Sequence, residues 1–379
     1  MERTFLEFFA GIGLVRVALE SRGWTPVFAN DIDPGKYRMY ADNFPDAAGR
    51  YIVADIHHLR AEDIPTATLA QASFPCVDLS LAGYRRGLNG RRSGSYWGFV
   101  KVLEELGERR PPIVLIENVV GFLSSDGGED FRVALEALGE LGYSYDAFVL
   151  NAVHFVPQSR PRLFVIGIRG EPRSESARLG FLQPRGSELC PSQLSVFMAR
   201  HNELKWCFLP LPSPPPPVTG FASLLERLED GDPRWWSEWR AEYLLNQMSS
   251  RHRRVAESMI TSDHVSYGTV YRRIRYGRSM AELRTDGVAG CLRTPKGGSS
   301  RQILFVAGRG RYRARLMTPR EYARLQGVPE GYRTTVPSNH ALFGFGDAVC
   351  VPAIQWIAKH ALEPLVKERA PGVRALSLA

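Results

Sequence analysis

The chain has 379 residues, of which 44% are apolar, 23% charged and 11% aromatic, enough for one large domain and a smaller one. We find no apolar run of membrane-spanning length, and the N-terminal M-E-R-T-F-L-E-F-F-A carries an acid in its apolar part and lacks a small-residue cleavage site. A transmembrane helix and a signal peptide are therefore not expected, and the composition favours a cytoplasmic, nucleoid-associated protein with no membrane partner.

The cysteines and the distribution of charge limit the kinds of protein that this sequence can encode. No C-x-x-C pair occurs among Cys76, Cys190, Cys207, Cys291 and Cys350, so the sequence predicts neither a disulfide framework nor a metal site. The net charge is +8, but residues 251–320 alone contain sixteen Lys or Arg and four Asp or Glu. Such segregated positive charge is typical of a polyanion-binding face, with nucleic acid the commonest polyanion.

The first 170 residues alternate between short apolar runs and helical patterns. Nearly continuous hydrophobicity in the runs predicts a mostly parallel sheet covered on both faces, which is a doubly wound, Rossmann-like α/β domain with ligands at the carboxyl ends of its strands. The predicted strands are Thr4–Phe9, Pro26–Asn30, Tyr51–Ala54, Gln71–Phe74, Ile113–Glu117, Ser144–Leu150 and Leu163–Ile168. The predicted helices between them are Leu14–Arg22, Pro34–Asn43, Tyr96–Gly107 and Asp130–Leu141.

This alternation stops after Arg169, and the sequence from there to about Arg315 shows no regular pattern of apolar runs and helices. The proline-rich stretch 209–217 predicts an extended linker, and 234–245 predicts a helix with a buried aromatic face. The amphipathic pattern at 348–362 predicts a helix that returns the chain to the first domain. We therefore expect a catalytic domain over 1–170, completed by 338–379, and a smaller irregular domain over 171–337.

The motif F-F-A-G-I-G at 8–13 is a strand that ends in a Gly-x-Gly turn and opens a helix. Glycines allow the backbone to approach a ligand closely, and the helix start offers unpaired N–H groups. Asp31 ends the next strand about 20 residues on, where a carboxylate accepts both ribose hydroxyls of a nucleoside. Asp55 follows the third strand. These three strand ends favour a cofactor that contains adenosine.

Two further strand ends carry reactive groups. Cys76 follows Pro75 in a loop after a strand, so its thiolate faces the ligand cleft and is a candidate nucleophile. Glu117 follows four apolar residues in P-I-V-L-I-E-N-V, where poor solvation suits a carboxyl group to hold or deliver a proton. Arg160 and Arg162, two apart in an extended segment, are expected to share a face and to orient the glutamate or bind a planar substrate.

In this order and spacing, these blocks resemble the DNA (cytosine-5) methyltransferase family. The likeness extends to T-P-R-E-Y-A-R-L-Q-G-V-P-E-G-Y at 318–332 and G-F-G-D-A-V-C-V-P at 344–352, and therefore covers most of the chain. The irregular basic stretch falls where that family keeps its target-recognition domain. The resemblance implies a monomeric enzyme that acts on double-stranded DNA, either beside a restriction enzyme or another phage-defence system or alone.

The same resemblance implies S-adenosylmethionine as cofactor, with S-adenosylhomocysteine as product. Asp31 would hold the ribose, Ile32 would pack on the adenine, and Asp55 would bond its amino group. The other implied cofactor contacts are Phe9, Gly11 and Gly13 around the methionine part, and Ile56, Pro75, Tyr96, Asp347 and Ala348.

For catalysis, the resemblance implies that Cys76 adds to carbon 6 of cytosine while Glu117 acts at ring nitrogen 3. Arg162, and less directly Arg160, would hold the base carbonyl and the glutamate. Because carbon 6 of a stacked base is out of reach, the cytosine must be flipped out of the duplex. The base that removes the carbon 5 proton is not evident from the sequence.

The basic stretch supplies the expected DNA contacts, but arginine binds phosphate as well as guanine, so no target site follows. The candidates are Arg272, Arg273, Arg275, Arg293, Thr294, Lys296 and Arg301. Three residues depart from the family pattern: Val77 replaces a glutamine, Asp347 an asparagine and Tyr96 a leucine.

Three alternatives remain open. An RNA (tRNA) cytosine-5 methyltransferase shares the chemistry, although the long basic insert favours duplex DNA. A nicotinamide-dependent oxidoreductase shares the sheet topology, but Arg16 stands where its third glycine is expected and Cys76 has no purpose in it. A DNA-binding module without catalysis would not need Cys76, Glu117 and Arg162.

Overall fold

The computed structural model describes residues 1–75, 94–170, 188–275, 277–294 and 301–368. The chain divides into two compact units. The first consists of 1–150, 161–214 and 353–379, and the second of 151–160 and 215–352.

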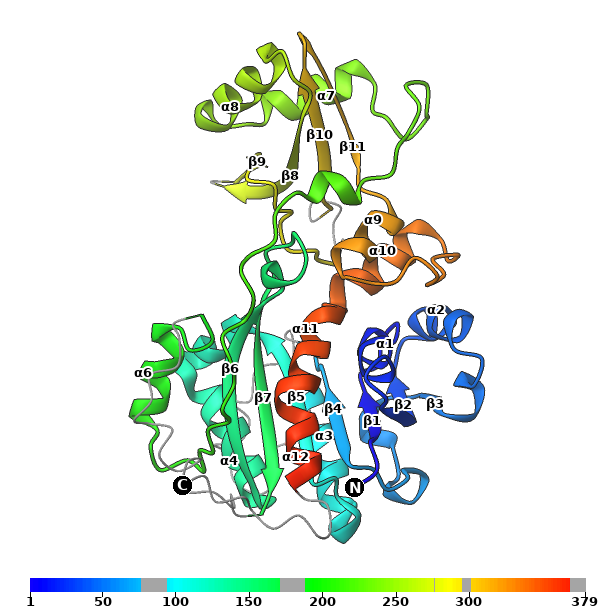
Figure 1. Cartoon of the computed structure of the whole chain (residues 1–379), viewed down its shortest axis with the longest axis vertical. Helices are drawn as coiled ribbons and strands as arrows, with labels where there is room; N and C mark the ends of the chain where they lie inside the picture. The colour runs from blue at the N-terminus through cyan, green and yellow to red at the C-terminus, as the bar shows by residue number, and fades with distance from the viewer. Residues whose placement is uncertain (76–93, 171–187, 276, 295–300, 369–379) are drawn as a thin grey trace. The chain divides into compact units, whose positions relative to one another are not determined.

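The first unit is built on a seven-stranded sheet in the order β3-β2-β1-β4-β5-β7-β6 (Figure 1). Parallel pairing joins β3 to β2, β2 to β1, β1 to β4 and β4 to β5, whereas β7 runs antiparallel to β5. The strands are β1 (Thr4–Phe8), β2 (Thr25–Asp31), β3 (Tyr51–Val53), β4 (Leu69–Ala72), β5 (Ile113–Val119), β6 (Tyr143–Asn151) and β7 (Pro161–Arg169). The prediction of a mostly parallel α/β sheet and the places of all seven strands are confirmed.

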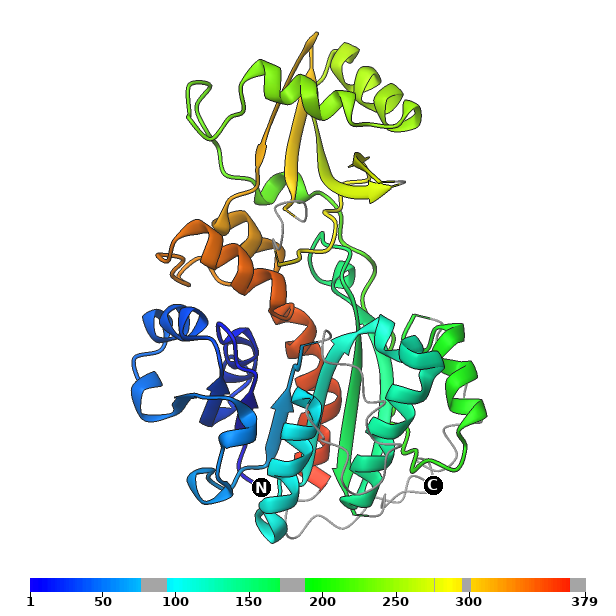
Figure 2. The ribbon, with the colours of Figure 1, turned by 180° about the vertical axis from the view of Figure 1, so that it is seen from behind.

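Helices cover both faces of this sheet. Figure 1 shows α11 and α12 across one face, and Figure 2, from behind, shows α3 and α4 across the other. The helices are α1 (Leu14–Glu20), α2 (Pro34–Asn43), α3 (Ser95–Glu105), α4 (Glu129–Glu140), α6 (Ser192–Arg200), α11 (Val351–Ile357), a π-helical turn (Ala358–Leu362) and α12 (Glu363–Glu368). The four predicted helices of the first 170 residues are therefore present.

Local sequence explains these elements. Six consecutive residues of β5 are buried, as expected for a central strand with helices on both sides. Asp33 caps α2 by accepting hydrogen bonds from the N–H groups of Gly35 and Lys36, and Pro34 occupies the first helical position, where its missing donor costs nothing.

The second unit is not the irregular domain that the sequence predicted. It contains an antiparallel sheet in the order β11-β10-β8-β9, built from β8 (Ser266–Arg275), β9 (Arg278–Arg284), β10 (Ile303–Gly308) and β11 (Arg311–Leu316). Its helices are α7 (Glu238–Asn246), α8 (Ser250–Thr261), α9 (Pro319–Leu325) and α10 (Ser338–Asp347). One face of the sheet packs against α7 and α8, where Leu244, Met259, Val270 and Phe305 share a core.

The expectation that the aromatic face of the 234–245 helix is buried was wrong in part. In α7, Trp239 is 73% exposed and Tyr243 is 48% exposed, and their rings stack on each other. Leu244 and Leu245 provide the buried side of the helix instead.

The C-terminal helical stretch Ser338–Glu368 is long and apolar enough to cross a membrane by composition, with mean hydropathy 1.5 over its most apolar window. A run of this length was not expected from the sequence. Because 72% of that window is buried inside the protein, the stretch has the character of a core helix, and its last part returns the chain to the first unit as predicted.

The boundaries of the two units differ from those expected. Residues 188–208 belong to the first unit, because Leu194, Phe197 and Phe208 pack into its core and Cys207 N–H donates to the carbonyl of Tyr145 in β6. Residues 338–352 belong to the second unit. The extended, proline-rich stretch contains one junction, between Pro214 and Pro215.

Candidate active site

The turn after β1 depends on two glycines in different ways. Gly11 and Gly13 have φ angles of +57° and +80°, which side-chain-bearing residues rarely adopt. A Cβ at Gly13 would lie 2.5 Å from the Phe44 ring and 2.8 Å from the Tyr40 ring, whereas a Cβ at Gly11 would meet nothing closer than 3.9 Å. Gly13 therefore lets α1 pack closely on α2, whereas a Cβ at Gly11 would make only ordinary van der Waals contacts, so Gly11 is required for its backbone conformation. Phe9 also has a positive φ, +56°.

Asp31 ties this turn to the end of β2. Its Oδ2 accepts a hydrogen bond from the N–H of Gly11 at 2.9 Å, and its Oδ1 accepts one from the N–H of Asp33 at 2.9 Å. Each carboxylate oxygen can accept a further bond, so a ligand hydroxyl fits beside these two. The Tyr51 hydroxyl donates to the carbonyl of Gly11 at 3.3 Å and braces the turn from β3.

The ends of β2 and β3 present an apolar surface next to an acid. Ile32, directly after β2, is 64% exposed, which is unusual for a large apolar side chain at the end of a buried strand. Asp55 accepts a bond from the N–H of His57 through Oδ1 at 3.0 Å and so starts the 3-10 turn Ile56–His58. Ile56 is buried below it. An exposed isoleucine beside a carboxylate fits a flat heterocycle with an amino group.

Glu7 in β1 is a residue that the sequence analysis did not place in the site. Its side chain is fully buried, its Oε1 accepts a bond from the N–H of Arg16 in α1, and its Oε2 has no hydrogen-bond partner among the described residues. Burial raises the pKa of this carboxyl to about 8. The sequence feature that could have identified Glu7 is the presence of an acidic residue inside the apolar run F-L-E-F-F. Glu7 holds the start of α1, and with it the glycine turn, to β1.

The end of β4 is held by the strand beside it. Asn118 in β5 donates from Nδ2 to the carbonyl of Phe74 at 3.1 Å. Phe74 is followed by the exposed Pro75, which is the last described residue before 94. The predicted nucleophile Cys76 and the neighbouring Val77 lie outside the described residues. Asn118 therefore positions the chain that leads into Cys76. Asn118 is part of the E-N-V motif, but no role was predicted for it from the sequence.

Glu117 and Arg162 meet at the carboxyl end of β5. The Nε of Arg162 lies 3.0 Å from Oε1 of Glu117, with the two side chains 15% and 7% exposed. Val119 is opposite Arg162 in the antiparallel register, so Glu117, two residues earlier, is its diagonal neighbour on the same face. This pair gives a nearly dry carboxylate with a fixed cationic partner, an arrangement that can hold a planar, polar ring.

Arg160 does not join that pair, contrary to the expectation of a shared face. Its guanidinium is 2% exposed and donates to the carbonyls of Leu292 at 2.8 Å, Gly346 at 3.1 Å and Ala348 at 2.5 Å. Sγ of Cys291 lies 3.5 Å from the same group. Arg160 is therefore an internal brace of the second unit.

Of three further expected cofactor contacts, Tyr96 lies in the core of the first unit, and Asp347 and Ala348 belong to the second unit. Tyr96 is 2% exposed in the core of the first unit, where its ring packs on Phe74 and its hydroxyl donates to the carbonyl of Ala134 at 2.5 Å. Asp347 is exposed at the end of α10 in the second unit, and Ala348 follows it as the C-cap residue.

The arginines of β8 divide between the two faces of its sheet. Arg273 and Arg275 lie on one face, and both form ion pairs with Glu282, at 3.5 and 3.0 Å. Arg272 lies on the opposite face, with its guanidinium 5.7 Å from the centre of the Trp236 ring. The basic run Y-R-R-I-R therefore does not present a single DNA-facing surface.

Four of the candidate DNA contacts fall in residues 293–301, and of this stretch the structure describes only the two ends. Arg293 is exposed, and the backbone of Arg293 and Thr294 lies so close to Gly346 that a Cβ there would come within 2.5 Å of it. Arg301 donates to Oδ1 of Asn339 at 2.6 Å. Lys296 lies outside the described residues.

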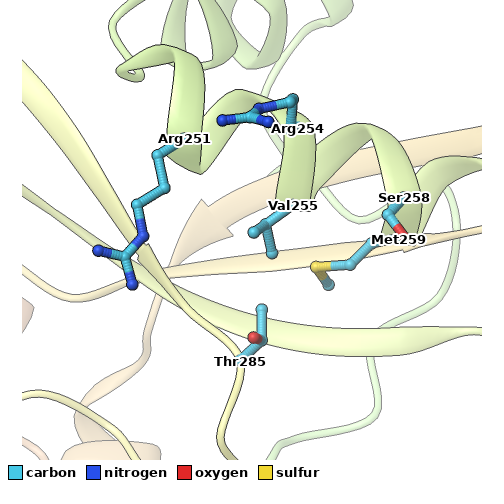
Figure 3. A pocket seen from close by; sticks show the side chains of 6 residues that line it. All are labelled: Arg251, Arg254, Val255, Ser258, Met259 and Thr285. Atoms are coloured by element: carbon cyan, nitrogen blue, oxygen red, sulfur yellow. The ribbon is translucent and has the colours of Figure 1, made fainter.

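The second unit also has an open depression of about 510 Å³ beside α8 (Figure 3). It contains no residue that the sequence analysis placed in the cofactor or catalytic site. Its lining consists of Arg251, Arg254, Val255, Ser258, Met259 and Thr285.

Comparisons with known proteins bear on this geometry. A family model described as C-5 cytosine-specific DNA methylase matches residues 3–363. The chain is 26% identical over 356 residues to the type II methyltransferase M.Bsp6I of Bacillus sp. (strain RFL6), covering 93% of this chain and 96% of that protein. It is 28% identical over 378 residues to M.HpaII of Haemophilus parainfluenzae, covering 96% and 90%.

The fold is similar to solved methyltransferase structures. The Schizosaccharomyces pombe Dnmt2 methyltransferase superposes with a TM-score of 0.60 at 18% identity, covering 96% of this chain and 99% of that one. A putative DNA modification methyltransferase encoded within an Escherichia coli prophage superposes with a TM-score of 0.58, also at 18% identity and with the same coverage. At these identities the likeness supports the fold alone.

Proposed function

The chain belongs to the C-5 cytosine-specific DNA methylase family, and from this premise we propose that it methylates a flipped-out cytosine in a specific duplex DNA site through a covalent adduct with Cys76. The enzyme class, DNA (cytosine-5) methyltransferase, and the methyl donor, S-adenosylmethionine, follow from the family and its type II relatives. The roles of individual residues, base flipping and the biological setting are the proposal.

The residues at the ends of β1, β2 and β3 fit the proposed cofactor. Asp31 would accept the ribose hydroxyls while keeping its bonds to the backbone, Ile32 would cover the adenine, and Asp55 would accept from the adenine amino group. Phe9, Gly11 and Gly13 would surround the methionine part. When bound there, S-adenosylmethionine supplies the methyl group that cytosine receives at carbon 5.

The protein's own part in the chemistry is carried by Cys76, Glu117 and Arg162. The Cys76 thiolate would form a bond to carbon 6 of the cytosine, which makes carbon 5 nucleophilic. Glu117 would donate a proton or hydrogen bond to ring nitrogen 3, and Arg162 would hold the glutamate and the base carbonyl. Water would take the carbon 5 proton; the bond to Cys76 then breaks, the thiolate is regenerated, and any proton that Glu117 gave to ring nitrogen 3 returns to it.

Access to the base requires flipping. Carbon 6 of a paired, stacked cytosine cannot reach a thiolate in a cleft, and unstacking one base costs a few kcal/mol. Phosphate contacts from the basic residues of the second unit would offset this cost. The observation that carries the proposal is the dry Glu117–Arg162 pair at the end of β5, next to the strand end that leads into Cys76.

The type II relatives support a role in restriction-modification. Another phage-defence system, and action in the cytoplasm close to the nucleoid, are part of the proposal. Bisulfite-type sequencing of DNA from cells that express the protein tests the chemistry and reveals the target site together. We expect 5-methylcytosine in one short sequence context. Transfer of labelled methyl groups to tRNA and not to duplex DNA would contradict the DNA assignment.

The nucleophile has its own test. Cys76→Ala should abolish methyl transfer while S-adenosylmethionine still binds, because no cofactor contact is assigned to that thiol. Cys190→Ala, a half-buried cysteine on the edge of the core, is the matched control and should retain activity. An active Cys76→Ala enzyme would falsify the covalent mechanism.

A further inference from the structure

Two arginines of the second unit converge on one tryptophan. The guanidinium carbon of Arg240, in α7, lies 4.1 Å from the centre of the Trp236 ring, and that of Arg272, in β8, lies 5.7 Å from the same centre. Cation–π contacts of this length hold a guanidinium in place without neutralising its charge. Two elements far apart in sequence thus deliver two positive charges to one indole.

These charges have no acidic partner within the described part of the chain. Neither Arg240 nor Arg272 forms an ion pair there, although Glu238 and Glu242 are on α7 itself. Burial, and then the nearby charge of Arg240, lower the pKa of the Arg272 guanidinium. Two like charges held together are unfavourable in the free protein and are relieved when an anion binds between or beside them.

Other arginines of the same unit differ in this respect. Arg273 and Arg275 share Glu282, Arg284 pairs with Asp286, and Arg253 pairs with Glu257. A count of positive charges in the sequence does not separate these paired arginines from Arg240 and Arg272. The structure distinguishes the neutralised arginines from the pair around Trp236.

Exposed apolar side chains border the pair. Trp239 and Tyr243 stack with ring centres 5.7 Å apart and planes 15° from parallel, and the Tyr243 phenol is close enough to act on Arg272. Ile274, two residues after Arg272 and thus on the same face of β8, is 74% exposed. Large apolar groups beside unpaired cations are typical of an interface and not of a solvated surface.

We propose that Arg240 and Arg272, held by Trp236, form a phosphate-binding site for the backbone of duplex DNA. Trp239 and Ile274 would contact the adjoining deoxyribose. The inference rests on the proposed function, because DNA is the polyanion for which that function requires docking contacts. A contact of this kind positions the duplex and does not read its sequence.

The experiment compares wild type with Arg240→Gln/Arg272→Gln in binding of a duplex containing the target site and of an unrelated duplex, at several salt concentrations. We expect the dissociation constants for both duplexes to rise by about tenfold, because hydrogen bonds to a charged group are lost. The slope of log affinity against log salt should fall in magnitude by about one, since one phosphate contact is removed.

Arg253→Gln is the matched control. It removes one positive charge from the same unit, but that charge is already paired with Glu257, so the salt slope should stay at the wild-type value. Thermal unfolding of each variant checks that the fold is intact. A wild-type salt slope in the double variant, or an effect no larger than that of Arg253→Gln, overturns the phosphate site.

The phosphate site and the proposed function give different results if they are wrong. If wild type methylates DNA but the double variant binds it normally, only the phosphate site is wrong. If wild type neither binds nor methylates duplex DNA, the proposed function is wrong as well.

Discussion

Arg162 and Glu117 form a diagonal ion pair across two antiparallel strands, with 3.0 Å between Nε and Oε1. Both side chains are nearly buried, so neither can turn to water without breaking the pair. A pair of this kind is costly to dismantle, because removing one partner leaves the other charge buried and unpaired. The geometry therefore suits a site that must hold a flat polar ring in one orientation.

We expect Glu117→Gln and Arg162→Gln each to lower kcat for methyl transfer by at least about 100-fold, the range found when a positioned proton donor or its partner is lost. Steady-state kinetics measure kcat, and single-turnover methyl transfer separates the chemical step from product release. Arg169→Gln is the control on the same strand: its pair with Glu108 is on the surface, where Glu108 is 99% exposed, and its loss should leave kcat unchanged. Equal effects at both ends of β7 would show that Arg162 has no special role.

The two glycines of the first turn should respond differently to alanine. Gly13→Ala places a methyl group against Phe44 and Tyr40, so we expect a loss of about 2 kcal/mol or more in the free energy of unfolding. Gly11→Ala would meet its nearest neighbours at 3.9 Å, an ordinary van der Waals distance, and should cost only about 1 kcal/mol, from its positive φ. Urea unfolding of the two variants tests this, and equal losses would contradict it.

Glu7 predicts a pH dependence of stability. Its pKa is raised from 4.5 to about 8 by burial, so the folded protein keeps a proton that the unfolded chain releases at lower pH. The folded state thus binds more protons between these values, and this contribution to stability is present below about pH 4.5 and lost as pH rises through 8.

Comparison of the free energy of unfolding of wild type and Glu7→Gln at about pH 5 to 9 tests this contribution. The variant cannot ionise at this position, so wild type should lose stability relative to it as pH rises. Glu108→Gln, an exposed glutamate, should leave the pH dependence as it is. A difference between wild type and Glu7→Gln that stays constant with pH would show that Glu7 does not titrate in this range.

The second unit contains a buried ion pair, Arg315 with Glu321, at 2.5 Å and with side chains 1% and 0% exposed. Glu321 also accepts from the N–H of Thr318, where it completes a capping box at the start of α9. We expect Glu321→Gln to destabilise the protein by about 3 kcal/mol, because Arg315 is left as an uncompensated buried charge.

A double-mutant cycle with Arg315→Met measures the coupling of this buried pair. The exposed pair of Arg324 and Glu330 provides the control, and Glu330→Gln should cost less than about 1 kcal/mol. Additive effects of the two changes at Arg315 and Glu321 would show that the two charges are not coupled.

The sequence predicted the first unit well because its strands are continuously apolar and its helices carry regular apolar stripes. The second sheet was missed because arginines interrupt its strands, as in Y-R-R-I-R of β8 and R-Y-R-A-R-L of β11, so neither strand contains a continuous apolar run. The alternation of arginine with Tyr312, Ala314 and Leu316 in β11 is itself typical of a strand and was not recognised. The exposed ring of Trp239 was likewise assigned to a core that other residues of α7 fill.

Within the candidate site, the local spacing of residues was enough to predict the positions of Glu117 and Asp31 at strand ends, but not the surroundings of Arg160. The groups that contact the guanidinium of Arg160 at Cys291, Leu292, Gly346 and Ala348 lie 131 to 188 positions away along the chain, so no motif of a few residues could reveal them. Tyr96 was assigned by analogy of position, and its contact with Ala134 depends on how α3 packs on α4. The roles assigned to Cys76 and Lys296 stay predictions.

The decapeptide 151–160 belongs to the second unit although it is encoded between two strands of the first. Gln158 donates to the carbonyl of Leu325, and Arg160 donates to those of Leu292 and Gly346. Hydrogen bonds therefore join this decapeptide to the segment 215–352. A chimera that exchanges only residues 215–352 between relatives would pair a foreign segment with the host's decapeptide. Grafting new target specificity onto this scaffold therefore calls for two separate gene fragments to be moved together.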